Sequence, residues 1–383
     1  MEITYLFTSD QGDVPVDQET LQRPFLLRPF EKHPFFTLGD FFRAVGDFFI
    51  QNMDRDRTDV PGESRGRPAG SGEIDSLLIR YEKYGSLYQM ASVEVLAGGD
   101  RAKYAVSAAL APEAKTVLDD EFELLKGLNR RYRLPYLPQV YFKDDVGIEK
   151  EGMADSFVMS LSEWFEGFHE WHFTGEPESR QVMVIWDQEK GYRHASPHES
   201  LEIIRQASKI LTLYYDTETY HQIFPWHHGA GDFVVRPRKD GIDVRLVTAR
   251  GYEPIVSSVD GEQIDPMTAI GYFFLNMTIK MRLDKAEGMG EPVWAPGFIL
   301  RAVTEGFLEA VRTKAAKGRD EYHAGSVESL IKILKELSEK NIQSRIHALT
   351  LSYKQHDPVD YEVIQRHSED HAREVHRAIQ DSL

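Results

Sequence analysis

The sequence of 383 residues predicts an α+β fold in which a strand-rich region precedes a mainly helical one. Between residues 77 and 161, five strand-like runs surround one helical segment, which falls between the third and the fourth run. A further strand pair is predicted over residues 233–247, and the segments after residue 268 repeat their apolar residues at helical spacing. A chain of this length is large enough for two domains or lobes.

The composition, 41% hydrophobic and 28% charged, is typical of a soluble globular protein. The formal net charge of -17 argues against binding of nucleic acid or of an anionic membrane, because stripes of Lys and Arg bind such phosphates. The absence of Cys excludes disulfides and thiolate metal sites. The sequence begins with no basic and apolar leader, and no run reaches the roughly 20 apolar residues of a spanning helix. We therefore expect a cytoplasmic protein.

Residues 1–53 are interpreted as an N-terminal extension that contains a short strand-like run and an amphipathic helix. The helix is predicted from Thr37, its N-cap, to Met53, because apolar residues recur there at helical spacing. We expect its apolar face to pack on the rest of the chain, and the alternative is a docking helix for a protein partner. Residues 54–73 are charged and rich in Gly and Pro, which predicts a flexible linker.

The next region, residues 74–162, is predicted to be rich in strands. Its strand-like runs cover residues 77–79, 93–96, 104–110, 137–142 and 157–161. The helix begins at Pro112, since Pro suits the first turn. Its apolar face is formed by Val117, Leu118, Phe122, Leu124, Leu125 and Leu128.

In order and spacing these segments resemble the protein kinase-like superfamily, which includes the aminoglycoside phosphotransferases. Residues 82–95 resemble the phosphate-covering glycine loop, and residues 104–110 resemble the strand that carries the nucleotide lysine. Residues 121–129 resemble the helix with the partner glutamate, and residues 162–170 resemble the hinge.

The resemblance implies a bilobal fold with a small five-stranded antiparallel β lobe that holds one helix. This lobe would cover residues 74–162, and residues 163–383 would form the hinge and a larger, mainly helical lobe. The Ala-Pro-Glu segment of protein kinases does not follow Gly251, which favours the small-molecule phosphotransferases.

The resemblance also implies cofactor-binding residues, of which several are altered. Gly85 is the one glycine of three that is present in the glycine loop, and Ser107 stands where the lysine is expected. Glu121 matches the glutamate, and adenine would meet backbone groups of Glu163 and Phe165 at the hinge. The lysines that could replace the missing one are Lys103 and Lys115.

The predicted catalytic loop precedes the strand pair of residues 233–247. Alignment on that pair puts His227 at the position of the catalytic base and Asp232 at that of the metal ligand. Imidazole accepts a proton near neutral pH, and carboxylate oxygen suits Mg²⁺. Thr248 replaces the second metal ligand, an aspartate, and Arg250 follows it. A hydroxyl beside an arginine is a poor magnesium site but a fair anion site.

We expect His227, His228, Asp232 and Arg250 to converge, because a short hairpin brings its two flanking loops together. Such a cluster of mixed charge suits a charged ligand, or it is a polar cluster whose members satisfy one another.

Two functions follow from the resemblance. The first is a pseudokinase-type binding or regulatory protein with a degenerate nucleotide site, and the alternative is a divergent phosphotransferase or other transferase that acts on a small molecule or a protein. ATP and Mg²⁺ are the implied cofactors, bound weakly or not at all because Ser107 and Thr248 replace charged residues. The acidic surface suits a basic protein partner or a cationic substrate. A third interpretation is an unrelated α+β domain.

Two further clusters have metal-binding residue types, and in each the alternative is ordinary packing or a solvated face. One is an aromatic run that contains His169, Glu170 and His172 together with Trp164, Phe165 and Trp171. The other lies at helical spacing near the C-terminus and consists of His367, His371 and Glu374.

Overall fold

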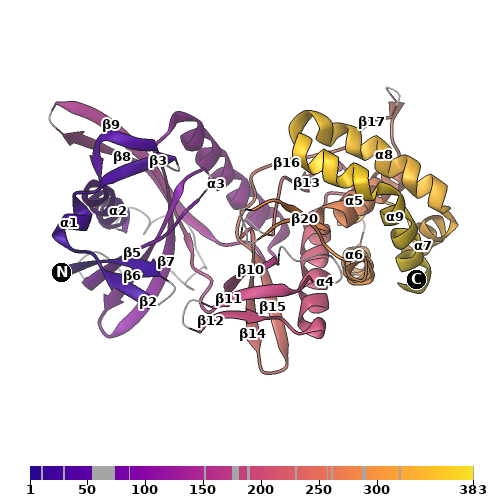
Figure 1. Cartoon of the computed structure of the whole chain (residues 1–383), viewed down its shortest axis with the longest axis horizontal. Coiled ribbons are helices and arrows are strands. Elements are labelled where there is room, and N and C mark those ends of the chain that lie inside the picture. Colours follow the sequence, from indigo (N-terminus) through magenta and orange to yellow (C-terminus); the bar gives the residue numbers. More distant parts are fainter. Residues whose placement is uncertain are drawn as a thin grey trace. The chain divides into compact units, whose positions relative to one another are not determined.

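The computed structural model divides the chain into two compact units, Met1–Glu166 and Gly167–Leu383, both drawn in Figure 1. The predicted linker of residues 54–73 lies outside the described residues, and so do Ser86 and Gly229. The structure describes residues 1–9, 12–28, 31–53, 74–85, 87–150, 152–174, 181–187, 190–228, 231–256, 258–259, 262–286, 290–318 and 321–382.

The first unit is built on a seven-stranded mixed sheet of order β2-β1-β5-β6-β7-β9-β8. Strands β1 and β5 are parallel, and all other neighbours in this sheet are antiparallel. Strands β3 and β4 form a separate pair. The elements are β1 (Glu2–Ser9), β2 (Gly12–Pro15), α1 (Gln18–Leu21), β3 (Pro24–Arg28), β4 (Glu31–Thr37), α2 (Leu38–Met53), β5 (Ile74–Tyr84), β6 (Gln89–Ala97), β7 (Asp100–Ala109), α3 (Pro112–Tyr132), β8 (Val140–Lys150) and β9 (Met153–Glu163).

The predicted fold class is therefore wrong for this unit, since a five-stranded antiparallel lobe with one helix is not what the chain forms. The difference comes from the first 53 residues, which belong to the unit and are not an extension of it. Strand β1 adds to the edge of β5, with Ile3 opposite Leu77. A local apolar pattern indicates a strand but does not reveal a partner so distant in the sequence.

Helix α2 covers one face of the sheet and supplies much of the core. Its N-terminus is capped reciprocally, because the backbone N–H of Thr37 donates to Asp40 Oδ2 (2.9 Å) and that of Asp40 donates to Thr37 Oγ1 (3.4 Å). Phe41 and Phe49 are fully buried, and the Phe41 ring lies 5.9 Å from that of Phe157 on β9. The prediction that this apolar face packs on the chain itself is confirmed.

Helix α3 packs on the opposite face of the same sheet. Alternate residues of β7 point to the two sides, so that Val106 contributes to the core under α2 while Ala109 contacts Leu118 of α3. The helix begins at Pro112, as predicted, and ends at Arg133, which has a left-handed conformation with φ 50°. The first unit is thus a sheet between two helices.

The second unit combines a five-stranded sheet of order β12-β11-β10-β14-β15 with several helices. All neighbouring strands in this sheet are antiparallel. The elements are β10 (His169–Phe173), β11 (Met183–Asp187), β12 (Gly191–His194), α4 (Pro197–Tyr214), β13 (Gln222–Ile223), β14 (Phe233–Arg238), β15 (Gly241–Leu246), β16 (Tyr252–Glu253), β17 (Ser258–Val259), β18 (Glu262–Gln263), α5 (Pro266–Lys280), β19 (Leu283–Lys285), β20 (Pro292–Trp294), α6 (Ile299–Lys317), α7 (Val327–Glu336), α8 (Glu339–His356) and α9 (Pro358–Ser382).

This sheet also corrects the prediction of a mainly helical second lobe. Trp171 and Phe173 of β10 are buried on one face, whereas His172 between them is partly exposed, so the aromatic run is a strand with alternating sides. Helix α4 is fixed to the sheet by Gln206, whose side chain donates to the carbonyl of Ile242 (2.6 Å) and accepts from the N–H of Val244 (3.1 Å).

Two predicted elements of this unit are confirmed. Strands β14 and β15 form the expected hairpin, in which Arg238 pairs with Gly241 across the turn. Helix α5 is buried over most of its length, and its N-cap Asp265 accepts from two backbone N–H groups. Figure 1 shows α5 beside α6 and α8 in this unit. Although α5 is apolar, neither it nor any other helix of the described chain is both long and apolar enough to cross a membrane.

Candidate functional site

The loops on the two sides of the β14–β15 hairpin meet at Asp232, whose side chain is buried. The Arg250 guanidinium donates to both carboxylate oxygens, with distances of 2.8 and 3.0 Å. The backbone N–H of His227 donates to the same carboxylate at 2.7 Å. The N–H of Val247 donates to the Asp232 carbonyl at 2.8 Å, which fixes the second loop against the first. Asp232 is thus held by a bidentate ion pair.

His227 also lies beside a second ion pair, which Lys280 and Asp360 form. Lys280 Nζ is 3.2 Å from Asp360 Oδ2, and both side chains are only 3% exposed. Burial lowers the pKa of Lys280, and the charge of Asp360 opposes this effect. Burial alone would raise the pKa of Asp360, but the neighbouring His227 and Lys280 outweigh burial and lower it to about 2. His227 Nε2 lies 3.3 Å from Lys280 Nζ.

The His228 ring packs among the rings of Trp171, Phe173 and Trp226. It is fully buried and stacks on the Trp171 ring at 4.9 Å. The nearest carboxylate oxygen, Asp284 Oδ2, is 3.7 Å from Nδ1, beyond hydrogen-bonding distance. Burial lowers the pKa of His228 well below its usual value, so this imidazole is neutral.

We call Asp232, Arg250, Lys280, Asp360 and His227 the ionic cluster. In it two carboxylates face two cations at ion-pair distance, so the charges neutralise one another in pairs. Arg250 occupies the oxygens of Asp232 that the sequence prediction assigns to Mg²⁺. Within the described ranges, no group of three or more His, Asp or Glu side chains is arranged to hold a metal ion. Thr248, the other predicted cofactor contact of this unit, is 5% exposed.

The remaining predicted cofactor residues lie in the first unit, where Tyr88 connects two of them. The N–H of Gly85 donates to the Tyr88 carbonyl at 3.1 Å. A Cβ atom on Gly85 would lie 2.5 Å from that oxygen, so the turn requires glycine. The Tyr88 hydroxyl donates to Glu121, which is 5% exposed and is therefore not a solvated residue of its helix.

Ser107 lies on the α3 face of β7, and its hydroxyl donates to Met90 Sδ at 3.2 Å. Lys103 shares that face, as the sequence pattern predicts. Its Nζ is 3.0 Å from the Glu82 carboxylate and 3.8 Å from the centre of the Trp164 ring. This lysine is therefore paired within the sheet.

The other residues predicted around a nucleotide have ordinary structural contacts. Lys115 Nζ is 3.3 Å from Asp155 Oδ1. Glu163 ends β9, where its carboxylate accepts from the N–H of Gln139 at 3.1 Å. Phe165 follows β9 and is partly exposed. The assignment of these residues to a cofactor stays a prediction.

The two histidine clusters do not form metal sites in the structure. His169 lies 3.7 Å from Asp187, and His172 contacts Tyr192 on the other face of the strand. Near the C-terminus, His371 is fully buried and lies 3.1 Å from the Thr278 hydroxyl. Its neighbour Glu374 accepts from the buried Arg282. Both clusters are part of the packing of the second unit.

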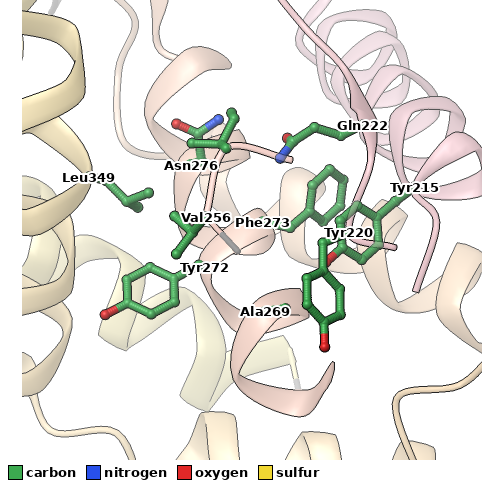
Figure 2. A pocket seen from close by; sticks show the side chains of 10 residues that line it. Tyr215, Tyr220, Gln222, Val256, Ala269, Tyr272, Phe273, Asn276 and Leu349 are labelled. Carbon is green, nitrogen blue, oxygen red and sulfur yellow. The ribbon is translucent and has the colours of Figure 1, made fainter. Parts of the chain in front are cut away.

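A pocket of this unit lies where the end of α4, strand β13 and helix α5 meet. Its empty space, including the part open to solvent, is about 200 Å³. Figure 2 shows the rings of Tyr215, Tyr220 and Phe273 close together and the carboxamide ends of Gln222 and Asn276 directed toward one another. We call it the aromatic pocket, and it is lined by Tyr215, Tyr220, Gln222, Ile255, Val256, Ala269, Tyr272, Phe273, Asn276 and Leu349.

One polar side chain of the aromatic pocket is buried without a hydrogen-bond partner in the described part of the chain. It is the Tyr215 hydroxyl, although the Tyr215 ring stacks on that of Phe273 at 4.3 Å. Gln222, which is 6% exposed, also lines the pocket. Buried polar groups are normally satisfied, so the Tyr215 hydroxyl indicates that water or a ligand completes the site.

The sequence prediction missed both the second ion pair and the aromatic pocket. A signal for them is present in α5, where Asn276 and Lys280 interrupt an otherwise apolar helix. A buried polar residue in such a helix needs a partner from elsewhere in the fold. Asp360, Tyr215 and Gln222 come from three other segments, which a pattern along the chain does not bring together.

Comparison with known proteins returns no match, either to a model of a protein family or to a curated protein sequence.

Proposed function

We propose that the second unit binds a small neutral ligand in the aromatic pocket. The observation that carries this proposal is the buried Tyr215 hydroxyl, which lines the pocket and has no hydrogen-bond partner among the described residues. Pockets that bind small molecules combine apolar walls with a few polar groups that fix the orientation of the ligand. The aromatic pocket has this composition.

The ligand should be uncharged, because the described residues that line the pocket include no Asp, Glu, Lys, Arg or His. Burial raises the pKa of Tyr215, and burial also raises the pKa of Tyr220, so both phenols stay neutral at physiological pH. A charged ligand would lose its hydration without gaining a counter-charge. The same composition favours binding over catalysis, since no acid, base or nucleophile active near neutral pH lines the pocket.

The ligand should also be small. The empty space of about 200 Å³ includes the part open to solvent, and the enclosed part has room for only about one water molecule. A single planar ring therefore enters only if partly exposed side chains of the rim, such as Val256, move aside, and the stacked rings of Tyr215 and Phe273 then provide an aromatic wall for it.

The pseudokinase-type and transferase functions stay predictions, and so do ATP and Mg²⁺ as cofactors. The fold that suggested them is not the one the chain adopts. The proposal for the aromatic pocket does not depend on them.

The proposal is tested by a screen of small neutral aromatic compounds, read by thermal shift and by ligand-observed NMR. Binding to the folded state raises the melting temperature in proportion to ln(1 + [L]/Kd). Compounds that stabilise the wild-type chain should fail to stabilise Ala269→Leu, because the added side chain fills the pocket from α5. Val256→Phe narrows the partly exposed rim and should act in the same direction.

The matched control is Ala316→Leu, which adds the same atoms at an exposed position of α6. Overpacking costs roughly 1–3 kcal/mol, so the folded state of each variant is first verified by circular dichroism. The proposal is wrong if no compound binds at millimolar concentration, or if binding is the same in both pocket variants and in the control.

A further inference from the structure

The enclosed part of the aromatic pocket has the size of one water molecule, and the rest of the pocket is open to solvent. The Tyr215 hydroxyl is buried and has no hydrogen-bond partner in the described chain. Because this hydroxyl is buried, a group that reaches it has to sit in the enclosed part of the pocket. The chemistry of the Tyr215 hydroxyl therefore decides which small group the enclosed part accepts.

The Tyr215 side chain is held in place from two sides. Its ring stacks on that of Phe273, with 4.3 Å between the ring centres and an angle of 21° between the planes. Its backbone N–H donates to the Thr212 carbonyl at 3.2 Å at the end of α4. The residue is only 1% exposed, and packed side chains have little space for another rotamer. We therefore expect the hydroxyl to keep its position and to be satisfied where it lies.

The polar groups beside Tyr215 in the pocket are engaged elsewhere. The Tyr220 hydroxyl donates to the Ile264 carbonyl at 2.9 Å. Asn276 Oδ1 accepts from the Tyr353 hydroxyl at 2.6 Å. These two hydrogen bonds fix side chains that could otherwise turn toward Tyr215. The missing partner of the Tyr215 hydroxyl is therefore a molecule from the solvent.

The partner has to be a donor and an acceptor at once. Burial raises the pKa of Tyr215, so the phenol keeps its proton, and a phenol both donates and accepts. A carbonyl or ether oxygen only accepts, whereas water and an alcohol hydroxyl do both from a single oxygen atom. An ammonium group is disfavoured, because the described residues that line the pocket include no Asp or Glu.

We propose that the enclosed part of the aromatic pocket is a hydroxyl site, which one ordered water molecule fills in the free protein and the hydroxyl group of a small alcohol fills in the complex. The alcohol part of this inference rests on the proposed binding function of the pocket, and the water part does not. Val256 and Ala269 contact the carbon chain of the alcohol in the open part. An alcohol displaces the water without loss, because its hydroxyl reproduces the hydrogen bonds of the water.

The water is tested by a high-resolution crystal structure of the full chain and by NMR cross-relaxation between water and Tyr215. We expect one ordered water at about 2.7–2.8 Å from the hydroxyl oxygen. Tyr215→Phe should lose this water. Tyr322→Phe is the matched control and should keep it, because Tyr322 also has a buried hydroxyl without a partner in the described chain but does not line the pocket.

The alcohol is tested with two isomers of equal volume, 1-butanol and methyl propyl ether, titrated into the full chain by NMR. The ether oxygen accepts but does not donate. One net hydrogen bond is worth roughly 1 kcal/mol, so 1-butanol should bind about five-fold more tightly than the ether. The preference should disappear in Tyr215→Phe and persist in Tyr322→Phe.

The outcomes separate this inference from the proposed function. If no ordered water lies within hydrogen-bonding distance of Tyr215, the inference is overturned. If the water is present but the two isomers bind equally well, the alcohol part is overturned, although the pocket binds small neutral molecules. If the water is present and neither isomer binds at millimolar concentration, the alcohol part is overturned, and the aromatic screen decides the proposed function separately. A preference for 1-butanol that persists in Tyr215→Phe would show that the contact is assigned to the wrong residue.

Discussion

The ionic cluster and the aromatic pocket lie in the same unit and differ in how their polar groups are satisfied. In the ionic cluster, Asp232 pairs with Arg250 and Asp360 pairs with Lys280. In the aromatic pocket, the buried Tyr215 hydroxyl has no partner among the described residues. Charged residues are conspicuous in a sequence, but here their charges are satisfied by one another. A buried polar group without a partner is the better indication of a ligand site.

The largest expected effect comes from breaking the buried pair. Asp360→Ala leaves the ammonium of Lys280 buried and unpaired, and we expect the free energy of unfolding to fall by about 3–5 kcal/mol in urea denaturation. Asp370→Ala on the same helix is the control. Asp370 pairs with Arg373 at the surface, with 71% of its side chain exposed, so its loss should cost less than about 1 kcal/mol. Equal losses would show that the buried pair is not a structural element.

A smaller loss of stability is expected at the ion pair between Asp232 and Arg250. Asp232→Ala and Arg250→Ala should each lower the free energy of unfolding by roughly 1–3 kcal/mol, because either change leaves a buried polar group without its partner. The double variant should cost less than the sum, since the two residues share one interaction. If stability is unchanged and ligand binding is lost instead, the ionic cluster is the binding site and its charges do not serve only to satisfy one another.

The pH dependence of stability should show His228 and Asp360 in two separate pH ranges, because both pKa values are lowered in the folded protein. Burial depresses the pKa of His228 below 6.5, so its contribution is present above pH 6.5 and is lost as the pH falls below that value. The pKa of Asp360 is about 2 against 3.8 for the free group, so its contribution is lost between these values.

Denaturation as a function of pH checks this expectation. His228→Phe keeps a ring against Trp171 and should reduce the loss of stability below pH 6.5. The reduction should be partial, because burial also lowers the pKa of His371, which titrates in the same direction. Asp360→Asn should reduce the loss of stability in the lower pH range. A wild-type profile without any decline between pH 6.5 and 5 would contradict the assignment of a neutral buried His228.

The smallest effect on stability is expected at the aromatic pocket. Tyr215→Phe removes a hydroxyl that has no partner in the described chain, so the free energy of unfolding should change by no more than about 1 kcal/mol, and an increase is the expected direction. The same variant should weaken ligand binding several-fold in calorimetry. Tyr220→Phe is the contrasting variant, because the Tyr220 hydroxyl donates to the Ile264 carbonyl at 2.9 Å and its removal should destabilise the unit.

The sequence predicted elements whose signal is local. Helix α2 follows from apolar spacing after the Thr37 cap, the β14–β15 hairpin from an Asp-Gly turn between apolar runs, and α5 from a nearly continuous apolar face. These predictions succeed because the residues that decide each element lie within one or two turns of it.

The sequence predictions that failed concern structures that depend on contacts between distant segments. The sheet of the second unit requires β10 to pair with both β11 and β14, and nothing within residues 169–173 specifies those partners. The aromatic pocket combines Tyr215, Gln222 and Asn276 from three elements. The first unit contains the five predicted strands, β5 to β9, with α3 between the third and the fourth, but the added β1 and β2 change the sheet. A kinase-like order of strands is thus insufficient evidence for a kinase-like fold.

The parallel pairing of β1 with β5 has a consequence for synthesis of the chain. Glu2 lies opposite Ser76, so the first strand leaves the ribosome well before its partner exists. Until then β1 has only the short strand β2 beside it, and two strands alone are marginally stable in water. Removal of the first nine residues would in turn leave the edge of β5 open to pairing with another chain. A version of this protein that lacks residues 1–9 should therefore self-associate.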